Sequence, residues 1–173
     1  MQIRKCQEKD SDSVANFYDE IVKYLDNHIN YPRWIYRVYP SKDSVNAMIQ
    51  EESQYVCICD ERIVGAFGLN DKPQGNFQKA NWSKEINDGS YMVLQALAID
   101  SCMQGQGLAS EVIGFCIEKA KSEGYEAIRL DIIPDNYPAK NLFEKNGFEY
   151  VGDVDLELSI GNNPSFSLYE LNF

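Results

Sequence analysis

Apolar residues recur along the chain at two different spacings, which predict a mixture of strands and helices. Apolar positions three or four residues apart are typical of a helix that buries one face, and they occur in residues 10–25, 41–50, 107–123 and 137–145. Alternating positions or short continuous apolar runs indicate strands, and they occur in residues 1–7, 55–59, 63–67, 91–99, 127–133, 148–160 and 165–173. The stretch 91–99 is mostly apolar, which is typical of a central strand covered on both faces.

The residues at the ends of these stretches support the predicted boundaries. Asp10 or Ser11 can cap the first helix and Ser41 the second, because short polar side chains accept hydrogen bonds from free backbone N–H groups there. Asn136 stands near the start of the fourth helix, and Gly124 follows the third. We therefore expect four helices that begin and end near these residues.

Irregular segments connect the predicted elements without dividing the chain. The segment 27–40 is rich in aromatic residues, and the segment 70–90 is long and polar. A loop of that length in a compact domain is usually functional or mobile. Polar turns at 60–61 and 161–164 join two predicted antiparallel strand pairs. No repeat or linker is visible, so we expect a single domain over 1–173.

Length, composition and charge narrow the classes of protein. The 173 residues include 44% apolar and 25% charged residues, and the net charge is −11. Nucleic-acid phosphates are bound by an excess of Lys and Arg, so we expect no nucleic-acid partner. No apolar run approaches the roughly 18 residues of a membrane-spanning helix, and residues 1–10 are already charged. These features predict a cytoplasmic protein without membrane contact.

The sequence has five cysteines and one histidine, His28. The cysteines include no Cys-x-x-Cys pair, and zinc sites usually need several Cys or His ligands at such spacings. Their odd number is typical of reduced thiols in a cytosolic protein. We therefore expect no metal site.

The stretch from Gln104 to Ala109 carries the clearest chemical signal, Gln-Gly-Gln-Gly-Leu-Ala. It follows a buried strand and opens a helix, where glycines let the backbone approach a ligand and N–H groups point outward. Such a turn suits a phosphate or pyrophosphate, although a plain tight turn is also compatible with it. A P-loop would need Lys before Ser or Thr where Leu108 and Ala109 stand, and a dinucleotide fold would need glycine in place of Ser110.

A second segment, from Asn136 to Phe148, completes a pair of motifs. Gln104, Gly107 and Ala109 fit the pattern Gln/Arg-x-x-Gly-x-Gly/Ala. The second segment fits Asn-x-x-Ala-x-x-Leu-Tyr-Glu-Lys-x-Gly-Phe with one departure. With two motifs at this separation, the sequence resembles the GNAT superfamily of N-acetyltransferases over essentially its whole length.

The resemblance implies an α/β (α+β) fold with a mixed, mainly antiparallel sheet of six or seven strands and helices on both faces. It also implies acetyl-CoA as co-substrate, with the pyrophosphate on the amides of 104–109 and the pantetheine arm on main-chain groups of Leu97 and Ile99. One of those N–H groups would stabilise the oxyanion that forms when the thioester is attacked. The residues expected to bind the coenzyme are Leu97, Ala98, Ile99, Gln104, Gly105, Gln106, Gly107, Leu108, Ala109, Ser110, Asn136, Ala139 and Phe143.

The resemblance leaves the catalytic acid and base open. Phe143 stands where the family often has a tyrosine that protonates the departing thiolate, and Val93 stands where it often has a glutamate base. His28, Tyr91 and Asp131 are the remaining candidates for a base, although an ion pair with a nearby Lys or Arg is the simpler role for Asp131. A further alternative is that holding thioester and amine together suffices for catalysis.

The expected activity is transfer of an acetyl group from acetyl-CoA to a primary amine of a small molecule or a protein, by direct attack on the thioester. The acceptor pocket is expected at Tyr31, Trp34 and Gln95, beside segments 27–40 and 70–90, although aromatic residues there can equally anchor the loops. The alternative is a non-catalytic acyl-CoA-binding sensor of the same fold, and a nucleotide-binding protein is a third class. Many chains of this fold form homodimers, but no sequence feature decides the oligomeric state.

Overall fold

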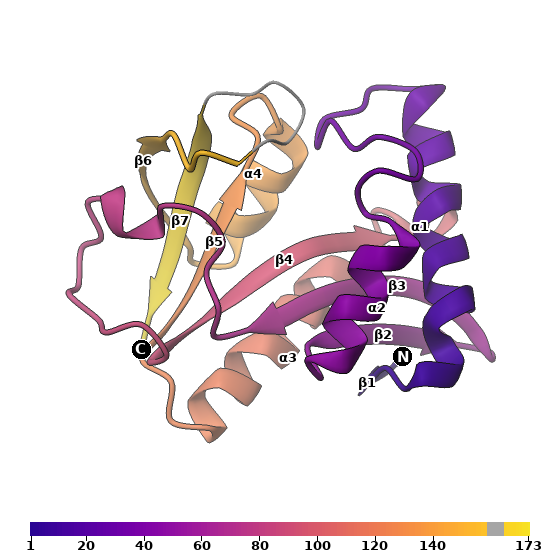
Figure 1. Ribbon diagram of the computed structural model, residues 1–173, viewed down its shortest axis with the longest axis horizontal. Helices are drawn as coiled ribbons and strands as arrows, with labels where there is room; N and C mark the ends of the chain where they lie inside the picture. The colour runs from indigo at the N-terminus through magenta and orange to yellow at the C-terminus, as the bar shows by residue number, and fades with distance from the viewer. Residues whose placement is uncertain (159–164) are drawn as a thin grey trace. The chain divides into compact units, whose positions relative to one another are not determined.

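The computed structural model describes residues 1–158 and 165–173, and the predicted turn 161–164 lies outside them. The helices are α1 (Ser11–Asp26), α2 (Lys42–Gln50), α3 (Leu108–Ser122) and α4 (Tyr137–Lys145), with short 3-10 helices η1 (Glu8–Asp10), η2 (Phe77–Lys79) and η3 (Ser101–Met103). The strands are β1 (Gln2–Lys5), β2 (Gln54–Cys59), β3 (Arg62–Asn70), β4 (Tyr91–Ile99), β5 (Ala127–Ile132), β6 (Glu149–Val154) and β7 (Phe166–Asn172) (Figure 1). Every stretch that the hydrophobic pattern assigned to a helix or strand contains one.

Within the described residues, the seven strands form one sheet in the order β1-β2-β3-β4-β5-β7-β6. β4 and β5 run parallel, whereas the pairs β1–β2, β2–β3, β5–β7 and β6–β7 are antiparallel. The predicted mixed, mainly antiparallel sheet is therefore confirmed. Asp60 and Glu61 close the β2–β3 hairpin at φ values of 48° and 62°, and two central residues at positive φ are typical of a two-residue hairpin turn.

The chain divides into two compact units. Unit 1 comprises Met1–Asn30, Trp34–Leu69 and Gln95–Val112, and unit 2 comprises Tyr31–Arg33, Asn70–Leu94 and Ile113–Phe173. β4 therefore contributes its first residues to unit 2 and its last residues to unit 1. The single domain over 1–173 stays a prediction.

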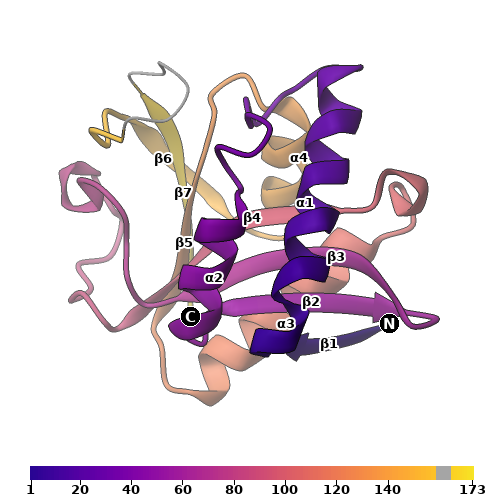
Figure 2. The ribbon, with the colours of Figure 1, turned by 45° about the vertical axis from the view of Figure 1, so that its right-hand side comes forward.

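The core of unit 1 lies between two helices and the strands beneath them. α1 and α2 lie over β2 and β3 (Figure 2), and they share an apolar cluster with these strands. Its buried members are Cys6, Val14, Phe17, Tyr18, Val45, Ile49, Val56, Ala66 and Ala98. Within each helix these residues are one, three or four positions apart, so each helix buries one face, as its apolar spacing predicts.

Three helix boundaries follow the predicted residues. The Ser41 hydroxyl caps α2 by accepting a hydrogen bond from the Ser44 N–H at 3.2 Å. In unit 2, the side-chain oxygen of Asn136 accepts one from the Ala139 N–H, also at 3.2 Å. Gly124 follows α3 at a φ of +83°, a conformation that glycine adopts with little strain.

The predicted side-chain cap of α1 was wrong. Asp10 stands at the N-cap position but makes no side-chain cap bond to the helix. Its carboxylate instead accepts hydrogen bonds from the Gln7 N–H at 2.8 Å and from the Arg4 guanidinium at 2.7 Å. The Ser11 hydroxyl donates to Asn46 of α2. Both side chains therefore bind partners outside α1. Asp10 does so because a guanidinium binds a carboxylate more strongly than a backbone N–H does.

The long segment 70–90 packs against the core of unit 2. That core contains Phe77, Tyr91, Val93, Ala127, Ile133, Leu156, Phe166 and Leu168, with Trp82 and Ile86 among the half-buried residues packed on it. The indole N–H of Trp82 also donates to the Phe77 carbonyl at 2.9 Å. These aromatic residues anchor the segment on the sheet.

A buried charged cluster in unit 2 strengthens this attachment. The Arg129 guanidinium of β5 lies between the rings of Trp82 and Tyr91, 4.2 Å and 4.3 Å from their centroids. Its Nε lies 3.7 Å from the carboxylate of Glu170, which faces it on β7. Glu170 in turn accepts a hydrogen bond from the Ser83 N–H at 2.7 Å. One ion pair thus joins two strands and the 70–90 segment.

Candidate functional site

The predicted glycine turn lies in unit 1, after β4 and the short helix η3. The Asp100 carboxylate accepts a hydrogen bond from the Cys102 N–H at 2.9 Å and so caps η3. The turn continues through Gly105 and Gly107 at φ values of +75° and +84°. A Cβ at either glycine would meet no atom within 4 Å, so the backbone conformation, and not crowding, favours glycine. α3 then begins at Leu108.

The backbone donors of this turn are not used by the protein itself. In the ranges that the structure describes, no residue accepts a hydrogen bond from the N–H groups of Gln104–Ala109. Gln104–Gly107 are also exposed. The first N–H groups of a helix lack intrahelical partners and lie at the positive end of its dipole. The turn therefore presents several donors to which a phosphate group can bind.

The last residues of β4 direct alternate main-chain groups away from β3. The Asp100 N–H donates to the Val64 carbonyl of β3 at 2.9 Å. Successive residues of a strand direct their N–H and C=O groups to opposite edges. Ala98 therefore faces the same edge as Asp100, and Leu97 and Ile99 face the other edge.

On that other edge, the ladder of β4 is short. Its parallel pairing with β5 comprises three residue pairs, the last of which joins Val93 to Arg129. Among the described residues, β4 has no further ladder partner on this edge from Ala96 onward. The main-chain groups of Leu97 and Ile99 are therefore arranged like those of a free strand edge, to which an extended ligand can hydrogen-bond.

The coenzyme-binding residues predicted on α4 lie in unit 2. Asn136 is buried and caps the helix through Ala139, which is half-buried. Phe143 is 5% exposed, and its ring lies 5.4 Å from that of Phe148. Val93, which stands where the family often has a glutamate, is buried in the apolar core. Neither Phe143 nor Val93 has a proton to exchange.

The residues predicted for the acceptor pocket fall in both units. Trp34 of unit 1 lies edge-on to Tyr18 and Tyr39, with ring centroids 6.0 Å and 6.4 Å apart, and packs against the apolar cluster. Gln95, also in unit 1, is half-buried. Tyr31 belongs to unit 2. The contacts of Trp34 fit an anchoring role, and its part in an acceptor pocket stays a prediction.

Two of the three candidate bases lie in environments that suit this role poorly. His28 is exposed; its ring stacks on Tyr24 at 4.0 Å, and its Nδ1 lies 2.8 Å from the Tyr24 carbonyl. Tyr91 is buried, and its hydroxyl donates to Asp88 at 2.8 Å. Burial raises the pKa of Tyr91 to about 12. Its phenol therefore keeps its proton at neutral pH and accepts none.

Asp131 of β5 has the properties of a proton acceptor near neutral pH. Burial raises the pKa of its carboxyl to about 6. The predicted ion pair was wrong, because no Lys or Arg of the described residues lies within ion-pair distance of this carboxylate. The basic residue two positions away, Arg129, is paired with Glu170 instead.

Sequence reasoning missed two residues that the structure singles out. Ala96 has a φ of +51° within β4, and alanine gives no sequence signal for this conformation. Arg129 interrupts an apolar run, and a charged residue inside such a run was an available signal of a buried ion pair.

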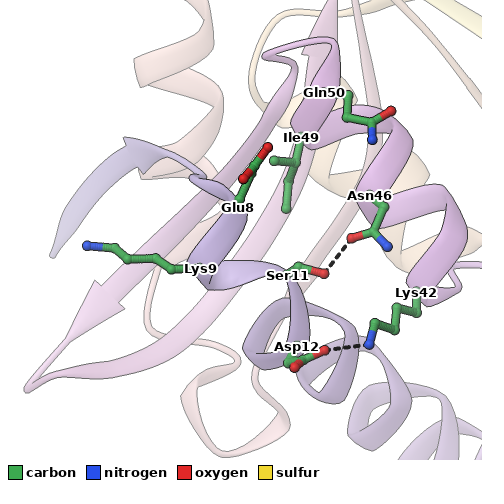
Figure 3. A pocket seen from close by; sticks show the side chains of 8 residues that line it. All are labelled: Glu8, Lys9, Ser11, Asp12, Lys42, Asn46, Ile49 and Gln50. Atoms are coloured by element: carbon green, nitrogen blue, oxygen red, sulfur yellow. Dashed lines mark hydrogen bonds and ion pairs between the residues drawn. The ribbon is translucent and has the colours of Figure 1, made fainter.

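A cleft of about 420 Å³ lies elsewhere in unit 1, beside the start of α1 and along α2 (Figure 3). It is lined by Glu8, Lys9, Ser11, Asp12, Lys42, Asn46, Ile49 and Gln50. Four of its polar side chains bind one another in pairs: Lys42 pairs with Asp12 at 2.6 Å, and the Ser11 hydroxyl donates to Asn46. No predicted site residue lines this cleft.

Within residues 1–158 and 165–173, no three His, Cys, Asp or Glu side chains gather in a way that could hold a metal ion. Over the same residues, every helix is too short or too polar to cross a bilayer. The five cysteines are free thiols. Burial raises the pKa of Cys6 and Cys57 to about 12, so these two thiols are poor nucleophiles.

Comparison with known families decides the class of the chain. The sequence pattern of the Acetyltransferase (GNAT) family matches residues 15–148, a range that contains both motifs. The chain belongs to the GNAT acetyltransferase family. The resemblance drawn from the two motifs is therefore confirmed. Enzymes of the GNAT family take their acetyl group from acetyl-CoA, the expected co-substrate.

One curated relative of this GNAT chain is an uncharacterised N-acetyltransferase of Methanocaldococcus jannaschii. The two are 21% identical over 151 residues, which cover 85% of this chain and 60% of the relative. The chain thus spans 60% of the length of that relative.

Solved structures share the fold at low sequence identity. A GNAT family acetyltransferase from Streptococcus agalactiae aligns with a TM-score of 0.80 and 19% identity, over 99% of this chain and 95% of the other. A Salmonella typhimurium protein, yncA, whose structure was solved with its cofactor acetyl-CoA, aligns with a TM-score of 0.70 and 17% identity, over 99% and 93%. These likenesses confirm the GNAT fold.

Proposed function

We propose that this protein is an acetyl-CoA-dependent N-acetyltransferase that acetylates a primary amine of a small molecule or a protein. One observation within unit 1 carries the proposal: among the described residues, Leu97 and Ile99 form a free strand edge, and the N–H groups of the turn that follows, Gln104–Ala109, have no acceptor. The edge suits the amides of a pantetheine arm, and the turn suits a pyrophosphate. Membership of the GNAT family supplies the class of chemistry.

The proposed coenzyme contacts are mainly main-chain groups. The pyrophosphate accepts hydrogen bonds from the amides of Gln104–Ala109 and from Ser110 in the first turn of α3, and the glycines leave the approach open. Leu97 and Ile99 bind the pantetheine arm through their N–H and C=O groups, as an added strand would. The contacts of Asn136, Ala139 and Phe143 with the coenzyme stay predictions.

The reaction forms a C–N bond and breaks the thioester C–S bond. The acceptor ammonium first loses a proton, and the resulting amine attacks the thioester carbonyl. A main-chain N–H of Leu97 or Ile99 stabilises the oxyanion of the tetrahedral intermediate. Its collapse expels the coenzyme A thiolate, and the nitrogen releases its second proton to water. The thiolate takes a proton from water in turn, because Phe143 has none to donate. A thiol has a pKa of about 8.5, so its thiolate is a good enough leaving group to depart without a side-chain proton donor.

We assign the acceptance of the ammonium proton to Asp131. A general base works best when its pKa lies close to the working pH, and burial brings the pKa of this carboxyl to about 6. Within the described part of the chain this carboxylate has no ion pair, which supports the assignment because a neighbouring cation would lower the pKa. Tyr91 keeps its proton at neutral pH, and His28 is exposed and stacked on Tyr24.

The test measures release of free coenzyme A thiol from acetyl-CoA across a panel of primary amines, together with calorimetric titration of coenzyme A, ATP and NAD. We expect thiol release with at least one class of amine, and tighter binding of coenzyme A than of either nucleotide. Binding of acetyl-CoA without thiol release for any amine would favour the non-catalytic sensor. Tighter binding of ATP or NAD would contradict the proposal.

A further inference from the structure

Ala96 adopts a left-handed backbone conformation within β4. Its φ is +51°, a region in which the Cβ of most residues crowds the neighbouring carbonyl oxygen and which glycine adopts freely. Ala96 directly precedes Leu97, whose main-chain groups the proposed function assigns to the pantetheine arm. A strained residue at this point needs neighbours that hold it in place.

The kink at Ala96 changes which side chains share a face of the strand. In a regular strand, Gln95 and Ala96 would point to opposite faces. Ala96 and Ala98 both pack against the apolar cluster beneath α1 and α2. Gln95 lies on that side as well, because a Cβ on Gly68 would meet Gln95 Cγ at 2.7 Å and the Sδ of Met48 in α2 at 2.9 Å. The alternation of side chains between the two faces of β4 is therefore shifted by one residue at the kink.

One side chain of α1 holds the kink. The Tyr18 hydroxyl donates a hydrogen bond to the carbonyl oxygen of Ala96 at 2.8 Å. The Tyr18 side chain is fully buried, and its ring lies edge-on to Phe17 at 5.8 Å and to Trp34 at 6.0 Å. Packing thus fixes the position of the hydroxyl, and burial keeps it from contacting a substrate.

Loss of this hydrogen bond would remove the partner that compensates for the strained conformation. Ala96 could then relax to an extended conformation, which most residues prefer in a strand. Because main-chain groups alternate between strand edges, such a relaxation would disturb the direction of the N–H and C=O groups of Leu97 and Ile99.

We propose that Tyr18 is a positioning residue for acetyl-CoA. Its hydroxyl holds the Ala96 kink and so directs the main-chain groups of Leu97 and Ile99 toward the coenzyme. This inference rests on the proposed function. It also links coenzyme binding to the segment after α1, because Trp34 of that segment packs against the Tyr18 ring.

The test uses Tyr18→Phe, which removes the hydroxyl and keeps the ring. One neutral hydrogen bond changes an equilibrium by up to about tenfold, so we expect the Kd of acetyl-CoA, measured by calorimetry, to rise about fivefold. KM for acetyl-CoA should rise by the same factor, and kcat should fall as well, because one of the displaced N–H groups is the proposed oxyanion donor.

A control and a rescue separate positioning from general loss of packing. Tyr125→Phe removes a half-buried hydroxyl in unit 2 that lies 3.4 Å from Asp71, and it should leave the Kd unchanged. In the Tyr18→Phe background, Ala96→Gly should return the Kd to within about twofold of the native value, because glycine adopts positive φ with little strain. Ala98→Gly in the same background should give no rescue.

The outcomes distinguish this inference from the proposed function. If the native protein binds no acetyl-CoA, the proposed function fails. If the native protein binds and Tyr18→Phe binds equally well, or if Ala96→Gly gives no rescue, the positioning role is overturned. Should Tyr18→Phe not fold, Ala96→Val replaces it, since a β-branched residue disfavours positive φ while the hydroxyl remains. An unchanged Kd in that variant would overturn the inference as well.

Discussion

The glycine turn of unit 1 and the Arg129 cluster of unit 2 treat polar groups in opposite ways. In the turn, the N–H groups of Gln104–Ala109 have no acceptor among the described residues, and most of these residues are exposed. In the cluster, the guanidinium of Arg129 is 2% exposed and lies between two aromatic rings, with the carboxylate of Glu170 facing it. The turn keeps its donors available to a ligand, whereas the cluster buries its two charged groups against each other within unit 2.

Substitutions in these two regions should therefore affect different properties, binding in the turn and stability in the cluster. Exposed donors are hydrated in the free protein, so a ligand can take them at little cost. A buried ion pair is expensive to break, because the remaining charge is left without a partner. We therefore expect stability to depend on the cluster and coenzyme binding to depend on the turn.

The largest expected effect is on stability in unit 2. Arg129→Met keeps most of the side-chain length but leaves the Glu170 carboxylate buried without its cation. We expect a loss of about 3–5 kcal/mol in the free energy of unfolding, measured by urea denaturation. Lys140→Met is the control, because Lys140 and Glu144 form an exposed pair on α4 and should contribute less than about 0.5 kcal/mol. Equal losses in the two variants would refute the structural role of the cluster.

The next effect is on turnover. Asp131→Asn removes the proposed base, and we expect kcat to fall by about 100-fold with little change in the Kd of acetyl-CoA. In the native protein the rate should rise with pH through about 6, since burial raises the pKa of Asp131 to about 6. Activity of the variant within about twofold of the native value would favour catalysis by positioning alone.

Asp131→Asn, which should lower kcat, should raise the free energy of unfolding. The pKa of Asp131 in the folded protein, about 6, lies above the unfolded value of about 3.9. Folding therefore disfavours the charged carboxylate, which lowers the free energy of unfolding of the native protein. This cost is absent below about pH 4, grows between about pH 4 and 6, and is fully present above about pH 6. We expect Asp131→Asn to be more stable by roughly 1–2 kcal/mol at pH 8 and unchanged at pH 3.5. A less stable variant at pH 8 would contradict the raised pKa.

A pair of matched glycines tests the turn. Gly107 and Gly124 have φ values of +84° and +83°, and a Cβ on either meets no atom within 4 Å. Alanine should therefore strain both positions alike, by about 1–2 kcal/mol in the free energy of unfolding. Calorimetry should show the Kd of acetyl-CoA raised at least about tenfold by Gly107→Ala and unchanged by Gly124→Ala. Parallel effects of the two variants on the Kd would remove the turn from the binding site.

The smallest effect is expected at the histidine. His28→Ala should leave kcat within about twofold, because the ring is exposed and stacks on Tyr24, with Nδ1 beside the carbonyl of that residue. A steady-state acetylation assay measures this. A fall in kcat as large as that expected for Asp131→Asn would move the base to His28.

The sequence predicted the helices, the strands, the cap of α2 and the glycine turn correctly, because each of these depends on residues that are close together in the chain. Apolar spacing located the helices and strands. Ser41 was recognised as a helix cap and Asn136 as a residue near a helix start, and Gly105 and Gly107 marked a turn that the structure places after β4 and η3. Each of these depends on the residue itself and its neighbours within one turn of helix.

The sequence did not predict side-chain contacts between residues that belong to different helices and strands. The side chain of Asp10 binds Arg4 of β1 instead of capping α1. Asp131 has no ion pair among the described residues, and Arg129, two positions before it, pairs with Glu170. The kink at Ala96 depends on a hydroxyl 78 positions away in the sequence. Only the fold brings such partners together.

The most direct test is a crystal structure of the protein with bound coenzyme A. We predict pantetheine amides within hydrogen-bond distance of the Leu97 and Ile99 main chain, and pyrophosphate oxygens on the amides of Gln104–Ala109. A coenzyme bound at any other place, or one that leaves both sets of main-chain groups without contact, would contradict it.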